Sequence, residues 1–144
     1  MLAVNNLCIE RNGRAIIQDL SFTLEGQKRL FVQGEIGSGK TTLLLALLGF
    51  VPVTKGEIKL FDQVCREEKD FAPFRGTIGI CFQNADDQLF GPTVLDDVAF
   101  GPLNQNMPRE QAYHIAEQLL EGLGITGLND RLVQSLSGGE KNFT

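Results

Sequence analysis

The sequence predicts an α/β fold that begins with a mostly antiparallel β segment and continues into helices. Three observations support this prediction: apolar segments separated by turn signals in the first sixty residues, a glycine-rich loop between an expected strand and an expected helix, and a helical pattern beyond about residue 94. A chain of 144 residues can bury one hydrophobic core. We therefore expect a single domain.

The first part of the chain contains segments rich in apolar and β-branched residues, which is typical of strands. We expect strands at Leu2–Ile9, Leu20–Leu24, Arg29–Gln33, Glu57–Phe61 and Thr77–Phe82, with turns at Asn12-Gly13, Glu25-Gly26, Lys55-Gly56 and Arg75-Gly76. Good helix formers fill Lys40–Leu48, and Gly49 and Pro52 supply a stop. The local order is therefore strand, glycine loop and helix.

The clearest helical pattern lies at residues 108–123. Its apolar residues recur at spacings of three and four, which places them on one face of a helix. They are Ala112, Ile115, Ala116, Leu119, Leu120 and Leu123. Pro108 suits a first helical turn, and Gly122 and Gly124 suit an exit, so we expect a helical insert after Phe82.

Charge and composition exclude several functions. The net charge is −5, which gives no general attraction to nucleic acid or to anionic lipid. Three cysteines without CxxC spacing suggest neither a disulfide framework nor a zinc site, and they suit a reducing compartment. The most apolar stretch, Leu43–Val53, is shorter than a membrane-spanning helix. A role at a membrane would therefore require a partner.

A phosphate-binding motif occupies the glycine loop. The residues Gly34-Glu35-Ile36-Gly37-Ser38-Gly39-Lys40-Thr41-Thr42 fit G-x-x-x-x-G-K-[ST] between an expected strand and an expected helix. The glycines let backbone N–H groups turn inward, and the start of the helix points its positive dipole end at the same anion. Lys40 would bind the β- and γ-phosphates, and the Thr41 hydroxyl would bind Mg²⁺. The motif predicts nucleotide binding without naming the nucleotide.

A second motif, Leu136-Ser137-Gly138-Gly139-Glu140, follows about a hundred residues later. By itself it would also fit a Gly-Gly turn. The order of phosphate loop, Gln83 and this pentapeptide resembles the nucleotide-binding subunit of ABC transporters, over essentially the whole chain. Residues 81–104 are similar to the glutamine loop and adjoining helical segment of ATPases from energy-coupling-factor importers, including the cobalt and nickel type. Glu140, where Gln is commoner, is compatible with that subfamily.

The resemblance implies a P-loop NTPase fold of the ABC type, with ATP and Mg²⁺ as cofactors. It implies that Gln83, beside the γ-phosphate, helps to hold Mg²⁺ and the attacking water. It also implies that the motif Leu136–Glu140, called the signature below, caps the ATP bound to a second ATP-binding subunit. The two subunits, identical or different, would face each other head to tail. A membrane-embedded transporter subunit would dock near the segment after Gln83, which places the protein on the cytoplasmic face of the cell membrane.

Two departures from the family pattern limit the resemblance. The family stacks an aromatic side chain on adenine, but residues 8–13 contain none, and the planar guanidinium of Arg11 is the alternative to a plain solvated arginine. After Glu140 only four residues remain, and Asp62, Asp96 and Asp97 do not end an apolar strand. We therefore expect a fold truncated before the Walker B strand and the catalytic glutamate, with the chain as the N-terminal part of a longer protein.

The resulting hypothesis is one incomplete ABC-type nucleotide-binding domain over residues 1–144. Residues 1–83 would form the β subdomain and phosphate-loop core, 84–137 the helical subdomain, and 138–144 the start of the helix after the signature. The parent protein would be an ATPase that drives importer uptake of a metal ion or vitamin, and residues 1–144 alone would be inactive. One alternative is a non-hydrolysing regulatory module that lends its signature to a complete partner. A small P-loop kinase is another, but it leaves the signature and Gln83 unexplained.

Overall fold

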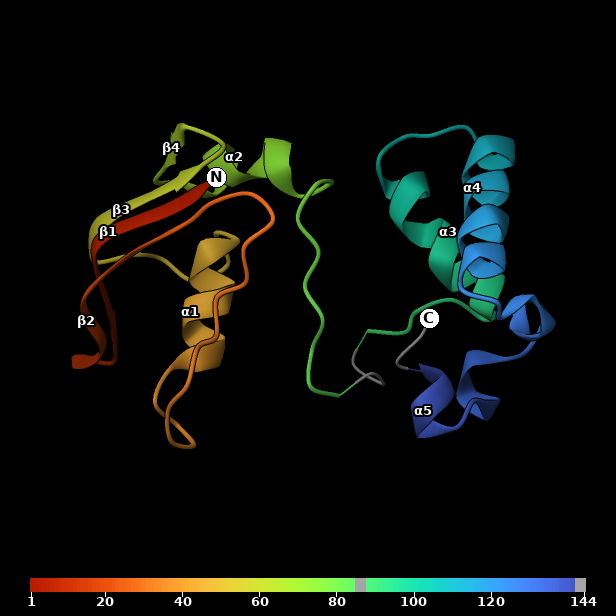
Figure 1. The fold of residues 1–144 in the computed structure, drawn as a ribbon, viewed down its shortest axis with the longest axis horizontal. Coiled ribbons are helices and arrows are strands. Elements are labelled where there is room, and N and C mark those ends of the chain that lie inside the picture. The colour runs from red at the N-terminus through yellow and green to blue at the C-terminus, as the bar shows by residue number, and fades with distance from the viewer. Residues whose placement is uncertain (85–87, 142–144) are drawn as a thin grey trace. The chain divides into compact units, whose positions relative to one another are not determined.

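The computed structural model describes residues 1–84 and 88–141. The chain forms two compact units, Met1–Ile78 and Gly79–Thr144, which we call the sheet unit and the helical unit (Figure 1). Strands of the sheet unit and helices of both units confirm the expected α/β class. The subdomain limits expected at residues 83 and 137 stay predictions.

The sheet unit is built on one antiparallel sheet with the order β2-β1-β3-β4. Its strands are β1 (Leu2–Arg11), β2 (Arg14–Leu24), β3 (Lys55–Leu60) and β4 (Gln63–Cys65). The expected turn at Asn12 and Gly13 joins β1 to β2, and both residues have positive φ, 52° and 73°. Such a two-residue turn matches the twist of a β-hairpin. Strand β2 starts at Arg14, directly after the turn, and the expected strand at Leu20–Leu24 is its last part.

Helix α1 (Lys40–Leu47) lies against one face of this sheet (Figure 1). Leu43 and Ala46 of α1 are buried in the same core as residues of three strands and of α2 (Glu68–Phe71). The other core residues are Val4, Leu7, Ile9, Ile58, Leu60, Cys65 and Phe71. Burial of this apolar face fixes the position of α1, and therefore of the loop before it.

Gly49 ends the turn after α1 with φ of 78°. A Cβ at this position would lie 2.5 Å from Cδ2 of the Phe71 ring. Glycine is therefore required here for two reasons, the left-handed backbone and the close approach of Phe71. The helix α2 that carries Phe71 was not expected from the sequence, although a capping box between Glu67 and Asp70 starts it.

Two expected strands are wrong within the described residues. The segment Arg29–Gln33 is irregular, and Phe31 in its middle is 79% exposed. Thr77–Phe82 is also irregular, with Cys81 and Phe82 exposed. Apolar, β-branched composition favours a strand only where a neighbouring strand completes the hydrogen-bond ladder, and no described strand pairs with either segment.

The helical unit contains α3 (Val94–Asn104), α4 (Arg109–Gly122) and the short α5 (Gly138–Lys141). Short 3₁₀ turns at Thr126–Leu128 and Val133–Ser135 connect α4 to α5. Fully buried Ala99 of α3 and Ala112 and Ala116 of α4 let these two helices pack closely. The helix expected at Pro108–Leu123 is thus confirmed, with Pro108 as the residue just before it.

Thr93 and Asp96 cap α3 and join it to α4. The Asp96 N–H donates to Thr93 Oγ1 at 3.2 Å, and the Thr93 hydroxyl donates to Asp96 Oδ2 at 2.6 Å. The Tyr113 hydroxyl of α4 donates to the other carboxylate oxygen, Oδ1, at 2.6 Å. The hydrogen bonds from the side chains of Thr93 and Tyr113 hold the pKa of Asp96 below its usual value, and the bond from Thr93 has the larger effect. An ionised Asp96 therefore bridges the start of α3 to α4.

Replacement of Thr93 by alanine removes the cap of α3 and one donor to Asp96. We expect Thr93→Ala to cost about 1 kcal/mol of local stability, the usual cost of losing such a cap. Faster amide exchange at residues 94–99 in the whole protein would measure this cost. The exposed Thr126 provides a control, because Thr126→Ala should leave exchange in α3 as it is, and equal effects of the two substitutions would contradict the capping role.

The exposed segments also predict behaviour in solution. The side chains of Leu30, Phe31 and Val32 are 46%, 79% and 42% exposed. An extended segment with exposed apolar side chains and unpaired backbone N–H and C=O groups tends to associate with another chain. We expect a protein made of residues 1–144 alone to be poorly soluble or self-associated. Gel filtration with light scattering measures this, and a monodisperse monomer would contradict the expectation.

Candidate nucleotide-binding site

The glycine loop runs from Gly34 to Gly39 and ends at α1. Gly37 and Gly39 have φ of 81° and 94°, in the left-handed region that favours glycine. A Cβ on Gly39 would lie 2.6 Å from Cγ2 of Ile16 in β2. The loop therefore lies against the β1–β2 hairpin, and a side chain at Gly39 would force it away.

Lys40 closes the loop from inside. Its ammonium Nζ donates to the carbonyl oxygens of Gly34 and Glu35, each at 2.8 Å. The Ser38 N–H also donates to the Glu35 carbonyl, at 3.2 Å. These bonds draw the loop into a ring around the lysine head group, and they turn these two carbonyls toward the ammonium.

The start of α1 leaves donors for an anion. The first N–H groups of a helix have no partner within the helix, and its N-terminus carries a partial positive charge. Within the described residues no side chain caps α1, and its first turn holds no acidic residue. The exposed hydroxyls of Ser38 and Thr41 lie at this end. The arrangement of an ammonium, N–H groups and hydroxyls suits a phosphate chain.

The residues at this site can also be compared with the ligands that a divalent metal needs. No cluster of three or more His, Cys, Asp or Glu side chains in the described part of the chain could hold a metal ion. Mg²⁺ commonly keeps several waters and binds one or two protein ligands together with substrate phosphates. Thr41 fits such a role as a single hydroxyl ligand, provided that phosphates supply most of the rest.

Gln83 belongs to the helical unit, where its side chain is exposed. The backbone just before it is held by Gln88, whose Oε1 accepts from the Phe82 N–H at 2.9 Å and whose Nε2 donates to the Ile80 carbonyl at 3.0 Å. Sequence reasoning did not select Gln88. Its side chain thus pairs with two backbone groups of the segment Thr77–Phe82, which has no neighbouring strand among the described residues.

Asp62 belongs to the sheet unit, whereas Asp96 and Asp97 belong to the helical unit. Asp62 lies in the turn between β3 and β4, with φ of 70°. Asp96 bridges α3 and α4, and Asp97 Oδ1 accepts from the N–H groups of Phe90 and Gly91, at 2.7 Å each. These contacts give Asp96 and Asp97 structural roles within the helical unit.

The signature lies at the start of α5. Glu140 Oε2 accepts from both the N–H and the hydroxyl of Ser137, at 2.7 Å each. These two hydrogen bonds hold the pKa of Glu140 below its usual value, and the bond from the hydroxyl has the larger effect. Leu136 anchors the segment in the core of the helical unit, whereas Gly138 and Gly139 are exposed.

Arg131 also holds the signature, and sequence reasoning missed it. Its Nη1 donates to Glu140 Oε1 at 3.1 Å, and its Nη2 donates to the Ser135 carbonyl at 3.2 Å. No local pattern marks an arginine nine residues before a carboxylate, because the turn at Val133–Ser135 brings the two together.

Arg11, the candidate base-stacking residue, ends β1. It is exposed, and its backbone lies opposite Arg14 of β2 across the hairpin turn. The same hairpin carries Ile16, which lies against Gly39 of the loop. The candidate base contact and the phosphate loop are therefore parts of one connected piece of the sheet unit.

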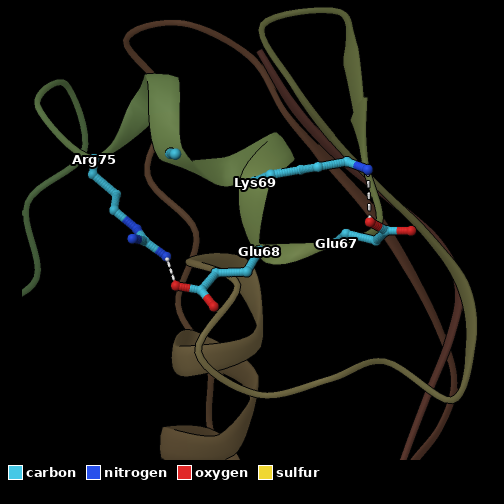
Figure 2. Close-up of a pocket in the computed structure, with 5 residues that line it drawn as sticks. Glu67, Glu68, Lys69 and Arg75 are labelled. Carbon is cyan, nitrogen blue, oxygen red and sulfur yellow. Dashed lines mark hydrogen bonds and ion pairs between the residues drawn. The ribbon is translucent and has the colours of Figure 1, made fainter.

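A separate hollow of about 510 Å³ lies beside α2 in the sheet unit (Figure 2). Its charged side chains point toward one another: Lys69 pairs with Glu67 at 2.8 Å, and Arg75 pairs with Glu68 at 3.0 Å. Arg75 also lies over the Phe50 ring, 5.3 Å from its centroid. With its charges already paired, this open hollow offers a ligand less than the phosphate loop does.

The glycine loop closed by Lys40 at the start of a helix defines a P-loop protein. The sequence pattern of the family described as ABC transporter matches residues 17–143, most of the chain. The chain therefore belongs to the ABC transporter family. This membership accounts for the phosphate loop and the signature on one chain.

Individual relatives show which ABC transporter proteins this chain is similar to. An ABC transporter ATP-binding protein of Haemophilus influenzae is 92% identical over 144 residues, which is 100% of this chain and 66% of that protein. The energy-coupling factor transporter ATP-binding protein EcfA of Methanocaldococcus jannaschii is 36% identical over 131 residues, 90% of this chain and 47% of that protein. The chain thus spans about half to two thirds of the length of these relatives.

A solved structure has the same fold. CbiO1 of Clostridium perfringens, described as part of the ABC transporter complex CbiONQ, superimposes with a TM-score of 0.86 at 28% identity. The likeness covers 99% of this chain and 57% of CbiO1. None of the helices in residues 1–84 and 88–141 is both long and apolar enough to cross a membrane.

We expect phosphate contacts to dominate nucleotide affinity. Lys40→Ala should abolish binding, whereas Arg11→Ala should weaken it less, because charge-assisted bonds to phosphate outweigh one exposed stacking contact. Titration with a fluorescent ATP analogue measures both affinities. Lys28→Ala, which removes an exposed lysine elsewhere in the sheet unit, is the matched control. Equal losses from Lys40→Ala and Arg11→Ala would refute the ranking.

Proposed function

We propose that this chain is part of the ATP-binding subunit of an ABC importer of the energy-coupling-factor type. In this role, ATP binding and hydrolysis by the whole protein drive the uptake of a metal ion or a vitamin. The observation that carries the proposal is the loop of Gly34 to Gly39 closed on Lys40 before the uncapped start of α1. Few other arrangements of backbone offer so many donors to a phosphate chain.

Binding begins at the loop. The Lys40 ammonium exchanges its two carbonyl partners for β- and γ-phosphate oxygens, while the N–H groups from Gly34 to Thr42 surround the chain of phosphates. The Thr41 hydroxyl would hold Mg²⁺, which would neutralise phosphate charge, and the Gln83 side chain would supply a further Mg²⁺ ligand. Gln83 also orients the attacking water. Arg11 would stack its planar guanidinium on the adenine ring.

The signature acts on a second subunit. The N–H groups of Gly138 and Gly139 would donate to the ATP held by a facing ATP-binding subunit, and the Ser137 hydroxyl would donate to it by turning away from Glu140 Oε2. Leu136 anchors this segment in the core of the helical unit, and Glu140 holds Ser137. Two subunits related head to tail would each complete the other's site.

A membrane-embedded subunit completes the transporter. It docks on the segment that follows Gln83, so the protein works on the inner face of the cell membrane, bound there through this partner. EcfA is named an energy-coupling factor transporter ATP-binding protein, and CbiO1 is described as part of the ABC transporter complex CbiONQ; both descriptions support this assignment. In such assemblies the membrane components choose the substrate, and cobalt, nickel and vitamins all fit the proposal.

Phosphate release from ATP tests the proposal. The whole protein, purified free of other ATPases, should hydrolyse ATP, and Lys40→Ala should reduce the rate to background, with Lys28→Ala as the matched control. A protein made of residues 1–144 alone should remain at background as well. Among its carboxylates, Asp96 and Asp97 accept hydrogen bonds within the helical unit and Asp62 lies in the turn between β3 and β4, so we expect none of these three to act as the general base that activates the water.

Three results would count against the proposal or a part of it. Hydrolysis by residues 1–144 above the Lys40→Ala background would show that the general base lies within these residues. Transfer of phosphate to an added small acceptor, with no release to water, would favour a P-loop kinase instead. Binding of ATP without any hydrolysis by the whole protein would favour a non-hydrolysing module that lends its signature to a partner.

A further inference from the structure

The signature carries a negative charge at a place where it would have to approach a phosphate. Glu140 is ionised at neutral pH, and it lies three residues after Ser137. A carboxylate facing a nucleotide phosphate is repelled, and the repulsion grows as the two surfaces exclude water. A segment that binds a phosphate therefore needs this charge to be compensated.

Arg131 provides that compensation in the structure. Its guanidinium contacts Glu140 Oε1 at 3.1 Å, while Glu140 Oε2 is occupied by the N–H and hydroxyl of Ser137. Both carboxylate oxygens thus have donors, and the arginine is anchored a second time on the Ser135 carbonyl. The side chains are 45% and 33% exposed, so the pair lies at the surface, where a partner would meet it.

We infer that Arg131 is a positioning residue for the signature: it neutralises Glu140 and holds it on Ser137, so that the exposed Gly138 and Gly139 can approach a nucleotide bound to a second copy of this subunit. The inference rests on the proposed function. It adds a residue outside both sequence motifs, and it assigns a role to the glutamate that replaces the commoner glutamine.

A charge role and a purely structural role make different predictions. A capping box at the start of α5 works with either Glu or Gln three residues after Ser137, so Glu140→Gln keeps the cap while it removes the charge. If Arg131 acts on charge, it becomes dispensable once Glu140 is neutral. If Arg131 acts only by holding the Ser135 carbonyl, Glu140→Gln changes nothing in an Arg131 variant.

The experiment is a double-mutant cycle on the nucleotide-dependent self-association of the whole protein. Arg131→Gln, Glu140→Gln and the double variant are compared by analytical ultracentrifugation with Mg²⁺ and a non-hydrolysable ATP analogue. We expect Arg131→Gln to weaken association by at least about tenfold, as for an uncompensated charge at an interface. Glu140→Gln should strengthen it by about threefold, because it leaves the Arg131 cation uncompensated and able to attract the phosphate. The double variant should regain the wild-type affinity.

Two controls separate charge from folding. Arg109→Gln lowers the net charge by the same amount elsewhere in the helical unit, and it should leave association as it is. Arg131→Lys retains the charge and should retain most of the association. Titration of the fluorescent ATP analogue at protein concentrations too low for association should give one affinity for all variants, because the phosphate loop is untouched.

The outcomes are distinct. A double variant as weak as Arg131→Gln, or an Arg131→Gln protein that associates like wild type, would overturn the inference while the proposed function stands. A wild-type protein that binds the analogue but never self-associates would overturn it as well. A wild-type protein that binds no nucleotide would overturn the proposed function itself, and the titration detects that case separately.

Discussion

The bond between the Lys40 ammonium and the carbonyls of Gly34 and Glu35 is the interaction on which the candidate site depends. It closes the glycine loop, and the left-handed backbone at Gly37 and Gly39 makes that closure possible. The loop keeps its place because α1 buries Leu43 and Ala46 in the core of the sheet unit. Hydrophobic packing thus positions the polar groups, and the polar groups define the chemistry.

The signature is likewise a glycine-rich segment that a buried residue anchors. Leu136 is buried, and the exposed glycines after it are held between this anchor and the Ser137–Glu140 cap. Arg131 adds a cation that offsets the glutamate. In both places a charged side chain shapes a glycine-rich segment, by binding carbonyls in the loop and by pairing with a carboxylate in the signature. Electrostatic contacts therefore add to hydrophobic anchoring in shaping both segments.

Local rules predicted the elements that local interactions form. The turn at Asn12-Gly13, the helix start at Lys40 and the helical pattern before Gly122 were all readable from the sequence, because each rests on φ preference or on spacing. The strands expected at Arg29–Gln33 and Thr77–Phe82 failed because a strand needs a partner that composition cannot supply. Arg131 and Gln88 were missed for a related reason: their contacts depend on tertiary geometry. The phosphate loop was the most predictable part of the site, since its chemistry is contained in consecutive residues.

Amide exchange of the whole protein, with and without an ATP analogue and Mg²⁺, tests the central claim most directly when it is repeated at low and high protein concentration. The claim is that the loop binds nucleotide within one subunit, whereas the signature contacts nucleotide held by another. It predicts protection at residues 34–42 at both concentrations, and protection at residues 137–140 only at the high concentration. Protection of the signature at the low concentration, or none at the loop at either concentration, would contradict it.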